Sequence, residues 1–85
     1  MSDSQNAPQI ILYGTNWCGD TRRARAFLDE RQVPYTYIDI DQNAEAARFV
    51  KEVNNGYRSV PTIVFPDGST LTEPSTTQLA AKLNL

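Results

Sequence analysis

The chain has 85 residues, of which 40% are hydrophobic and 21% charged, with a net charge of −2. This length allows one small domain, and the balanced charge argues against a nucleic-acid or anionic-membrane partner, which needs an excess of basic residues. One cysteine and no histidine exclude an intrachain disulfide and a self-contained zinc site of the common cysteine/histidine type. Without an apolar run of bilayer length or a signal-peptide pattern, the sequence predicts a cytoplasmic protein.

The first half of the chain alternates between strand and helix patterns. Residues 1–8 are polar and predict a disordered tail. The apolar run at 9–13 predicts a buried strand. A helical pattern follows from about 19 to 32, and residues 35–40 alternate with period two, which predicts a second strand. The inward face of the predicted helix consists of Ala24, Phe27 and Leu28.

A second helix is predicted at 41–53. Its apolar residues recur at the i, i+3, i+4 and i+7 positions that define one helix face. Either Asp41 or Asn43 is suited to cap its N-terminus. The predicted inward stripe consists of Ala46, Phe49, Val50 and Val53.

The last part of the chain predicts a hairpin and a short helix. Strand patterns at 62–65 and 70–72 flank the turn sequence P-D-G-S at 66–69, which favours an antiparallel hairpin. Ser75, followed three residues later by Gln78, fits a capping box at the start of the final helix.

The resulting element order is β-α-β-α-β-β-α. A helix joins the first two strands, which should therefore be parallel with a right-handed crossover, while the last two should be antiparallel. The sequence predicts an α/β fold: a mixed four-stranded sheet with three helices that cover both of its faces.

Four short motifs fall at defined places in this order: W-C-G (17–19) at the first helix, S-V-P (59–61) before the hairpin, D-G (67–68) in its turn, and P-S (74–75) at the last helix. With these motifs, residues 9–85 resemble the glutaredoxins, which have the thioredoxin fold. They are most similar to the mycoredoxin-like branch of short bacterial glutaredoxins. The resemblance implies one glutaredoxin-like domain. The sequence departs from dithiol members at Thr21, which stands where they have a second cysteine.

Cys18 is the candidate nucleophile for thiol–disulfide exchange, in which the thiolate reacts. It directly precedes the first predicted helix, where free backbone N–H groups and the helix dipole favour negative charge. Arg22 and Arg23 add positive charge nearby, and Asp20 opposes them. Without the resemblance, Cys18 could also be an inert buried residue.

Thr21 and Trp17 complete the predicted catalytic group around Cys18. The Thr21 hydroxyl either donates to the Cys18 thiolate or makes only local backbone hydrogen bonds. Trp17 either borders the sulfur as a rim for substrate or simply packs against its neighbours.

The resemblance also implies a substrate groove. A cis bond before Pro61 would turn the N–H and C=O of Val60 toward an extended substrate. Arg58 would meet one carboxylate of a low-molecular-weight thiol, and the N–H groups of Ser75 and Thr76 another. From the residues alone, Pro61 could equally be a trans proline at a strand start, Arg58 a solvated loop residue, and Ser75 only a helix cap.

The predicted function is thiol–disulfide exchange by a monothiol mechanism on mixed disulfides between proteins and a low-molecular-weight thiol. Glutathione or a mycothiol-like thiol would be the co-substrate of a monomeric enzyme with no tightly bound cofactor or metal. Two alternatives remain open. C-G-D-T (18–21) resembles the C-G-x-S of monothiol glutaredoxins that bridge an iron–sulfur cluster between two subunits, and a non-catalytic thioredoxin-fold binding module would carry a vestigial Cys18.

Overall fold

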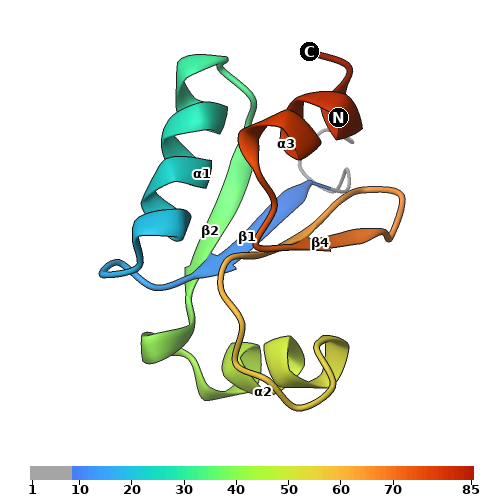
Figure 1. Cartoon of the computed structure of the whole chain (residues 1–85). Helices are drawn as coiled ribbons and strands as arrows, with labels where there is room; N and C mark the ends of the chain where they lie inside the picture. The colour runs from blue at the N-terminus through green and yellow to red at the C-terminus, as the bar shows by residue number, and fades with distance from the viewer. Residues whose placement is uncertain (1–8) are drawn as a thin grey trace, which may run out of the picture.

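The computed structural model describes residues 9–85, so the predicted tail at 1–8 lies outside the described residues. Figure 1 shows a sheet with helices on both faces. The strands are β1 (Ile10–Gly14), β2 (Tyr35–Asp39), β3 (Thr62–Val64) and β4 (Thr70–Thr72). The helices are α1 (Gly19–Glu30), α2 (Ala44–Val53) and α3 (Thr76–Leu83), with a 3₁₀ turn, η2 (Ile40–Gln42), before α2.

The sheet has the strand order β2-β1-β3-β4. β1 is parallel to β2, with Leu12 opposite Tyr37, and antiparallel to β3, with Leu12 opposite Ile63. β3 and β4 form the predicted antiparallel hairpin. The mixed four-stranded sheet and the three helices confirm the fold class predicted from the sequence.

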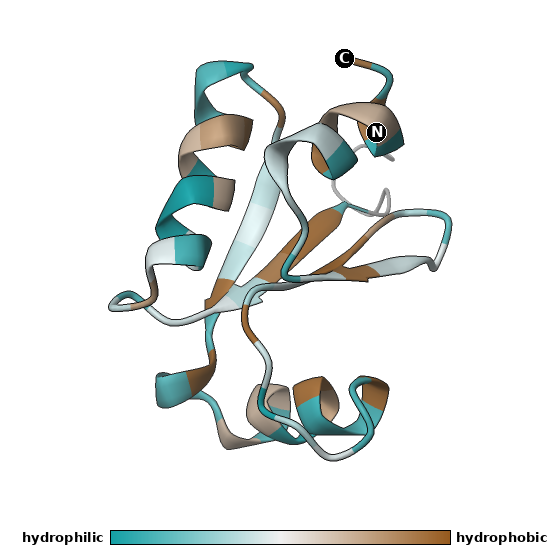
Figure 2. Ribbon diagram, in the orientation of Figure 1, coloured by the Kyte–Doolittle hydropathy of each residue, from teal (hydrophilic) through white to brown (hydrophobic). Residues whose placement is uncertain are grey.

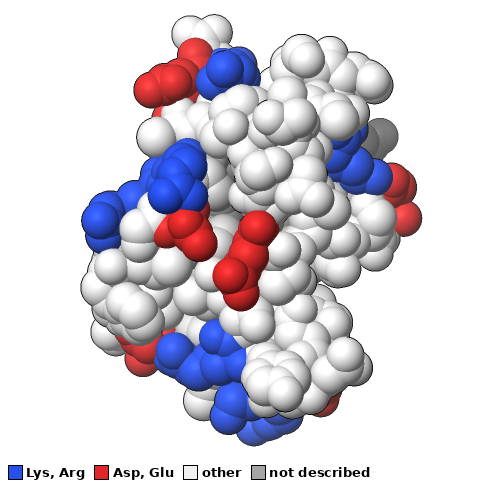
Figure 3. All heavy atoms as spheres, in the orientation of Figure 1, with Lys and Arg blue, Asp and Glu red and all other residues white. Residues whose placement is uncertain are grey.

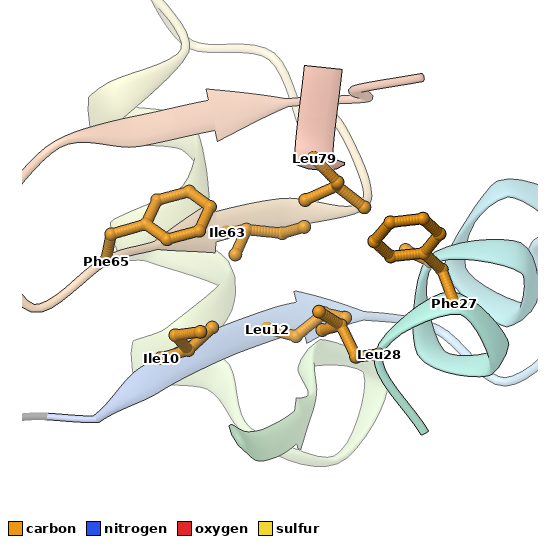
Figure 4. Close-up of a cluster of buried hydrophobic side chains, with 8 residues drawn as sticks. Ile10, Leu12, Phe27, Leu28, Ile63, Phe65 and Leu79 are labelled. Atoms are coloured by element: carbon orange, nitrogen blue, oxygen red, sulfur yellow. The ribbon is translucent and has the colours of Figure 1, made fainter. Parts of the chain in front are cut away.

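The larger core lies between the sheet and the pair α1 and α3, on the upper face in Figure 1. Alternate residues of β1 point into it, which explains why Ile10 and Leu12 are buried. Figure 2 shows the corresponding hydrophobic colour along the central strands. Figure 4 shows the side chains that meet there: Ile10, Leu12, Phe27, Leu28, Ile63, Phe65 and Leu79.

The smaller core lies on the opposite face, under α2. Ile40, Ala46 and Val50 are its buried members, and Tyr13 of β1 packs against them. The predicted inward stripe of α2 was wrong in one member, because Val53 is 41% exposed. The helical period continues to Val53, which lies at the last position of α2, beyond the residues that pack against the sheet.

The predicted helix at 41–53 consists of two separate elements. The Asp39 side chain accepts a hydrogen bond from the Asp41 N–H at 2.9 Å and caps η2. Asn43 is extended, with φ at −148°, and its Oδ1 accepts from the Ala46 N–H at 2.9 Å. Asn43 is therefore the cap of α2, and the side chain of Asp41 is available for other contacts.

Candidate active site

Cys18 occupies the N-cap position of α1, between the end of β1 and the first helical residue. Its backbone is extended, with φ −81° and ψ 124°, and its carbonyl accepts from the Arg22 N–H at 3.1 Å. Its side chain makes no capping hydrogen bond within the described chain. The first N–H groups of α1 therefore receive no hydrogen-bond acceptor from the side chain of the N-cap residue, the partly buried Cys18.

The second loop of the site lies opposite Cys18. The Cys18 Sγ donates to the Val60 carbonyl oxygen at 3.9 Å, although the two residues are 42 positions apart in the sequence. The Val60–Pro61 peptide bond is cis, and Pro61 is buried. The Thr62 hydroxyl donates to the Ser59 carbonyl at 2.8 Å and fixes this loop at the start of β3.

Thr21 lies in the first turn of α1 and is fully buried. Its Oγ1 accepts from the Thr15 N–H at 3.4 Å, a local backbone contact of the kind that was one of the two predicted alternatives. Its side chain also packs closely over Gly14, where an added Cβ would lie 2.5 Å from Thr21 Cγ2. Thr21 thus joins the first turn of α1 to the loop that precedes Cys18.

Trp17 and Arg58 are brought together by a residue that sequence reasoning did not identify as part of the site. The Trp17 Nε1–H donates to Asp41 Oδ2 at 2.8 Å, and Arg58 Nη2 donates to Asp41 Oδ1 in an ion pair. The hydrogen bond from Arg58, and then that from Trp17, hold the pKa of Asp41 below its usual range. Trp17 is 67% exposed, so most of its indole remains on the surface beside Cys18.

The sequence held one signal that could have identified Asp41. Ligand sites of α/β sheets form beyond the carboxyl ends of parallel strands. Cys18 follows the end of β1 and Asp41 follows the end of β2, and the parallel register places Gly14 opposite Asp39. The two residues therefore leave the sheet at the same edge.

The loop before Cys18 is held by α1 and β2. Arg22 Nη1 donates to the Trp17 carbonyl at 3.1 Å, and the Tyr37 hydroxyl donates to Asn16 Oδ1 at 2.7 Å. Arg23 instead pairs with Asp20 at 2.6 Å. Of the two arginines predicted to favour the thiolate, one is therefore committed to the loop backbone and the other to a neighbouring carboxylate.

Ser75 and Thr76 lie at the start of α3. The predicted capping box is present: Ser75 Oγ accepts from the Gln78 N–H at 3.1 Å, and the Ser75 N–H donates to Gln78 Oε1 at 2.8 Å. The Ser75 N–H predicted for substrate is thus occupied within α3. Thr76 lines a groove of about 290 Å³ between α1 and α3, together with Arg23, Ala26, Phe27, Glu30 and Arg31.

A family model for glutaredoxin matches residues 10–69. The chain is 46% identical to a protein of Mycobacterium tuberculosis named as a glutaredoxin, over 87% of this chain and 88% of that protein. It is 39% identical to mycoredoxin 1 of Corynebacterium glutamicum, over 87% of this chain and 91% of that protein. The chain belongs to the glutaredoxin family.

Solved structures share the fold of this chain. A variant of a thioredoxin-like protein superposes with a TM-score of 0.79 at 26% identity, covering 89% of this chain and 95% of that one. A glutaredoxin from Archaeoglobus fulgidus superposes with a TM-score of 0.74 at 24% identity, covering 95% and 91%, and shows the shared fold. The resemblance predicted from the sequence is confirmed, and the chain is a thiol–disulfide oxidoreductase of the glutaredoxin family.

Two further observations concern residues 9–85. None of the helices in this range has the length and apolar character needed to cross a membrane. Over the same range, cysteine, aspartate and glutamate side chains do not gather in a group of three or more that could hold a metal ion.

Proposed function

We propose that this glutaredoxin reduces mixed disulfides between proteins and a low-molecular-weight thiol by a monothiol mechanism. One observation carries the proposal. Cys18 is the only cysteine in the sequence, and it lies at the N-terminus of α1, which has no side-chain cap. An intramolecular disulfide cannot form, because Cys18 is the only cysteine in the sequence and Thr21 stands where dithiol members have their second one. The reaction must therefore end with an external thiol.

The first step transfers the small thiol to the enzyme. The Cys18 thiolate attacks the small-thiol sulfur of the mixed disulfide, a new S–S bond forms, and the client protein leaves as a thiolate that takes up a proton. The free N–H groups at the start of α1 stabilise the attacking thiolate. The Val60 backbone, which lies against Sγ, is suited to align an extended substrate.

The second step regenerates the enzyme. A second molecule of the small thiol attacks its counterpart on Cys18, the symmetric small-thiol disulfide leaves, and the Cys18 thiolate is restored. The small thiol is thus a co-substrate, and glutathione and a mycothiol-like thiol are the two candidates. Arg58 and the N-terminus of α3, including Thr76, are the groups proposed to meet its polar ends.

We further propose that residues 9–85 act as one monomeric domain in the cytoplasm. A monothiol cycle consumes reduced small thiol in every turnover, and the cytoplasm keeps such thiols reduced. The partners are S-thiolated or oxidised proteins, and neither nucleic acid nor membrane takes part in the cycle. Figure 3 shows both basic and acidic side chains on the face that it draws.

The test is the release of a small thiol from a glutathionylated or mycothiolated peptide, with the corresponding reduced thiol in excess. We expect turnover by the natural protein and background release by the Cys18→Ser variant. Equal rates for the two proteins would refute the proposed function. The choice between the two thiols follows from the ratio of kcat/KM values measured with each.

A further inference from the structure

Asp41 connects two loops of the active site that are far apart in the sequence. One carboxylate oxygen accepts from the indole of Trp17, which precedes Cys18, and the other pairs with Arg58, two residues before Val60. The side chains of Asp41 and Arg58 are 36% and 38% exposed. The pair therefore lies at the surface of the site, where a ligand can reach it.

The backbone of Asp41 is held in place by the fold. Its N–H donates to Asp39 Oδ1 at 2.9 Å, and the residue between them, Ile40, is 2% exposed in the smaller core. Asp39 in turn belongs to β2, in register with Gly14 of β1. The carboxylate is thus presented from a fixed turn at the edge of the sheet, directed at both Trp17 and Arg58.

The ion pair with Asp41 reduces the positive charge and the number of free N–H donors that Arg58 presents to a ligand. In the free protein the guanidinium is already paired with an internal carboxylate. A small thiol with a carboxylate at this end must share the guanidinium with Asp41 or displace it, and two carboxylates on one guanidinium repel each other. A thiol with hydroxyl or amide groups at this end can use the remaining N–H donors of Arg58 without that repulsion.

We propose that Asp41 is a specificity-determining positioning residue that weakens binding of small thiols whose Arg58-facing end carries a carboxylate. The inference deepens the proposed function and rests on it, because it takes Arg58 as the group that meets the small thiol. Asp41 acts through Arg58 and has no part in the exchange chemistry itself. Asp41 also accepts a hydrogen bond from the indole of Trp17, so a change in the ion pair between Asp41 and Arg58 also affects Trp17.

Trp17 provides a direct readout because it is the only tryptophan of the chain. Its indole N–H bonds to the same carboxylate that pairs with Arg58, so a ligand that displaces Asp41 must change the surroundings of the fluorophore. Binding can therefore be followed by Trp17 fluorescence with S-methylglutathione, which has both carboxylates and no reactive sulfur. The diethyl ester of S-methylglutathione is the matched probe, since it lacks the free carboxylates.

The experiment compares the dissociation constants of the two probes for the natural protein, Asp41→Asn and the control Asp67→Asn. Asparagine can retain an acceptor for Trp17, removes the negative charge, and replaces the oxygen that accepts from Arg58 with an NH2 donor. The control removes a carboxylate from another surface ion pair, between Asp67 and Lys82, which joins the β3–β4 turn to α3. In Figure 1 this turn and the loop before α1 lie at opposite sides of the molecule.

We expect Asp41→Asn to bind S-methylglutathione about two- to fivefold more tightly than the natural protein does, a modest gain because exposed ion pairs are weak. Affinity for the ester and the affinities of Asp67→Asn should stay unchanged. Adding Arg58→Gln to Asp41→Asn should remove the gain. Three results would overturn the inference. Asp41→Asn could bind S-methylglutathione no more tightly than the natural protein does, or its affinity for the ester could rise by the same factor. The third result is that none of these proteins binds S-methylglutathione. Because the probes do not react, absent turnover contradicts only the proposed function.

Discussion

The N-termini of α1 and α3 lie on the same side of the sheet and are built in opposite ways. The start of α3 is closed, because Ser75 and Gln78 exchange side-chain and backbone hydrogen bonds in a capping box. The start of α1 is open, because the N-cap residue is Cys18 and its side chain makes no capping bond within residues 9–85. A good cap stabilises a helix by about 1 kcal/mol, so the chain gives up stability at the start of α1.

The missing cap sets the N-terminus of α1 apart from those of the other helices, and we propose that this is the helix end that takes part in the reaction. The start of α2 resembles that of α3, since Asn43 Oδ1 caps it. Only at α1, among these three helices of the described chain, do the first N–H groups face a cysteine instead of a capping oxygen. Because no capping oxygen occupies these N–H groups, we propose that they are free to interact with the sulfur of Cys18 during the reaction.

Closing the open end should have the largest effect. In Cys18→Ser the hydroxyl can accept from the backbone N–H of Asp20 or Thr21, because serine is a favourable N-cap. We expect turnover to fall at least about a thousandfold, since the nucleophile is gone. The free energy of unfolding should rise by about 0.5–1 kcal/mol. Turnover of a small-thiol mixed disulfide and urea unfolding measure the two effects, and a variant that is inactive but less stable would argue against an open helix end.

A second sulfur in the first turn of α1 should change the chemistry. We expect mild oxidation of Thr21→Cys to consume both thiols and lower the mass by two hydrogens, because residues 18 and 21 lie one helical turn apart. Loss of the acceptor for the Thr15 N–H should also lower the free energy of unfolding by about 1 kcal/mol. Thiol titration and mass spectrometry measure the oxidation.

The matched control for this variant is Ala26→Cys, which places the second sulfur on an exposed position further along α1. It should keep two free thiols under the same oxidation. If Thr21→Cys also keeps both thiols, then residue 21 is not within reach of Cys18, and the monothiol site does not depend on the residue at this position.

Opening the closed end of α3 should affect stability. In Ser75→Ala the Gln78 N–H loses its acceptor, so the free energy of unfolding should fall by about 1 kcal/mol. The control Thr77→Ala changes an exposed neighbour in the same turn and should alter stability by less than about 0.5 kcal/mol. Urea unfolding at neutral pH measures both. If the free energy of unfolding fell equally in Ser75→Ala and Thr77→Ala, the capping box would stabilise α3 no more than water at an uncapped helix end does.

The smallest expected effect concerns the other end of α3. Asp67 accepts from Lys82 at 2.7 Å and from the Ser69 N–H at 2.9 Å, and these contacts hold the pKa of Asp67 well below its usual range. A carboxylate with a lowered pKa in the folded state stabilises the protein above its unfolded pKa of about 3.9, and this stabilisation is lost as the pH falls. Asp67→Asn should therefore have a slightly lower urea midpoint than the natural protein at pH 7, and the gap should narrow below about pH 4. If the difference between the two urea midpoints did not change with pH, the charge of Asp67 would not be its cause.

Features that depend only on residues close together in the sequence could be predicted. The capping box of Ser75 and Gln78 spans four residues, and the β3–β4 hairpin surrounds a short turn. Errors arose where the local pattern continued beyond its tertiary support. The helical period of α2 includes Val53, but the sheet no longer covers that position, so its side chain is exposed.

The place of Asp41 at the end of β2 could be inferred from the strand order, but its contacts with Trp17 and Arg58 could not be predicted. These contacts require that the chain break its helical pattern at Asn43, that β1 and β2 pair in one particular register, and that Arg58 return to the same edge. Each condition depends on the packing of the whole domain. Cys18 was easier to place, since one strand, one cysteine and one helix follow each other directly in the sequence.

The open end of α1 is proposed to make Cys18 a nucleophile. The most direct test compares how fast oxidised glutathione thiolates Cys18 at pH 7 in the folded protein and in the protein unfolded in urea, with mass spectrometry of the adduct. We expect one adduct per chain, formed about tenfold or more faster in the folded protein, even though folding partly buries Cys18. A folded protein that reacts no faster than the unfolded chain would contradict this proposal.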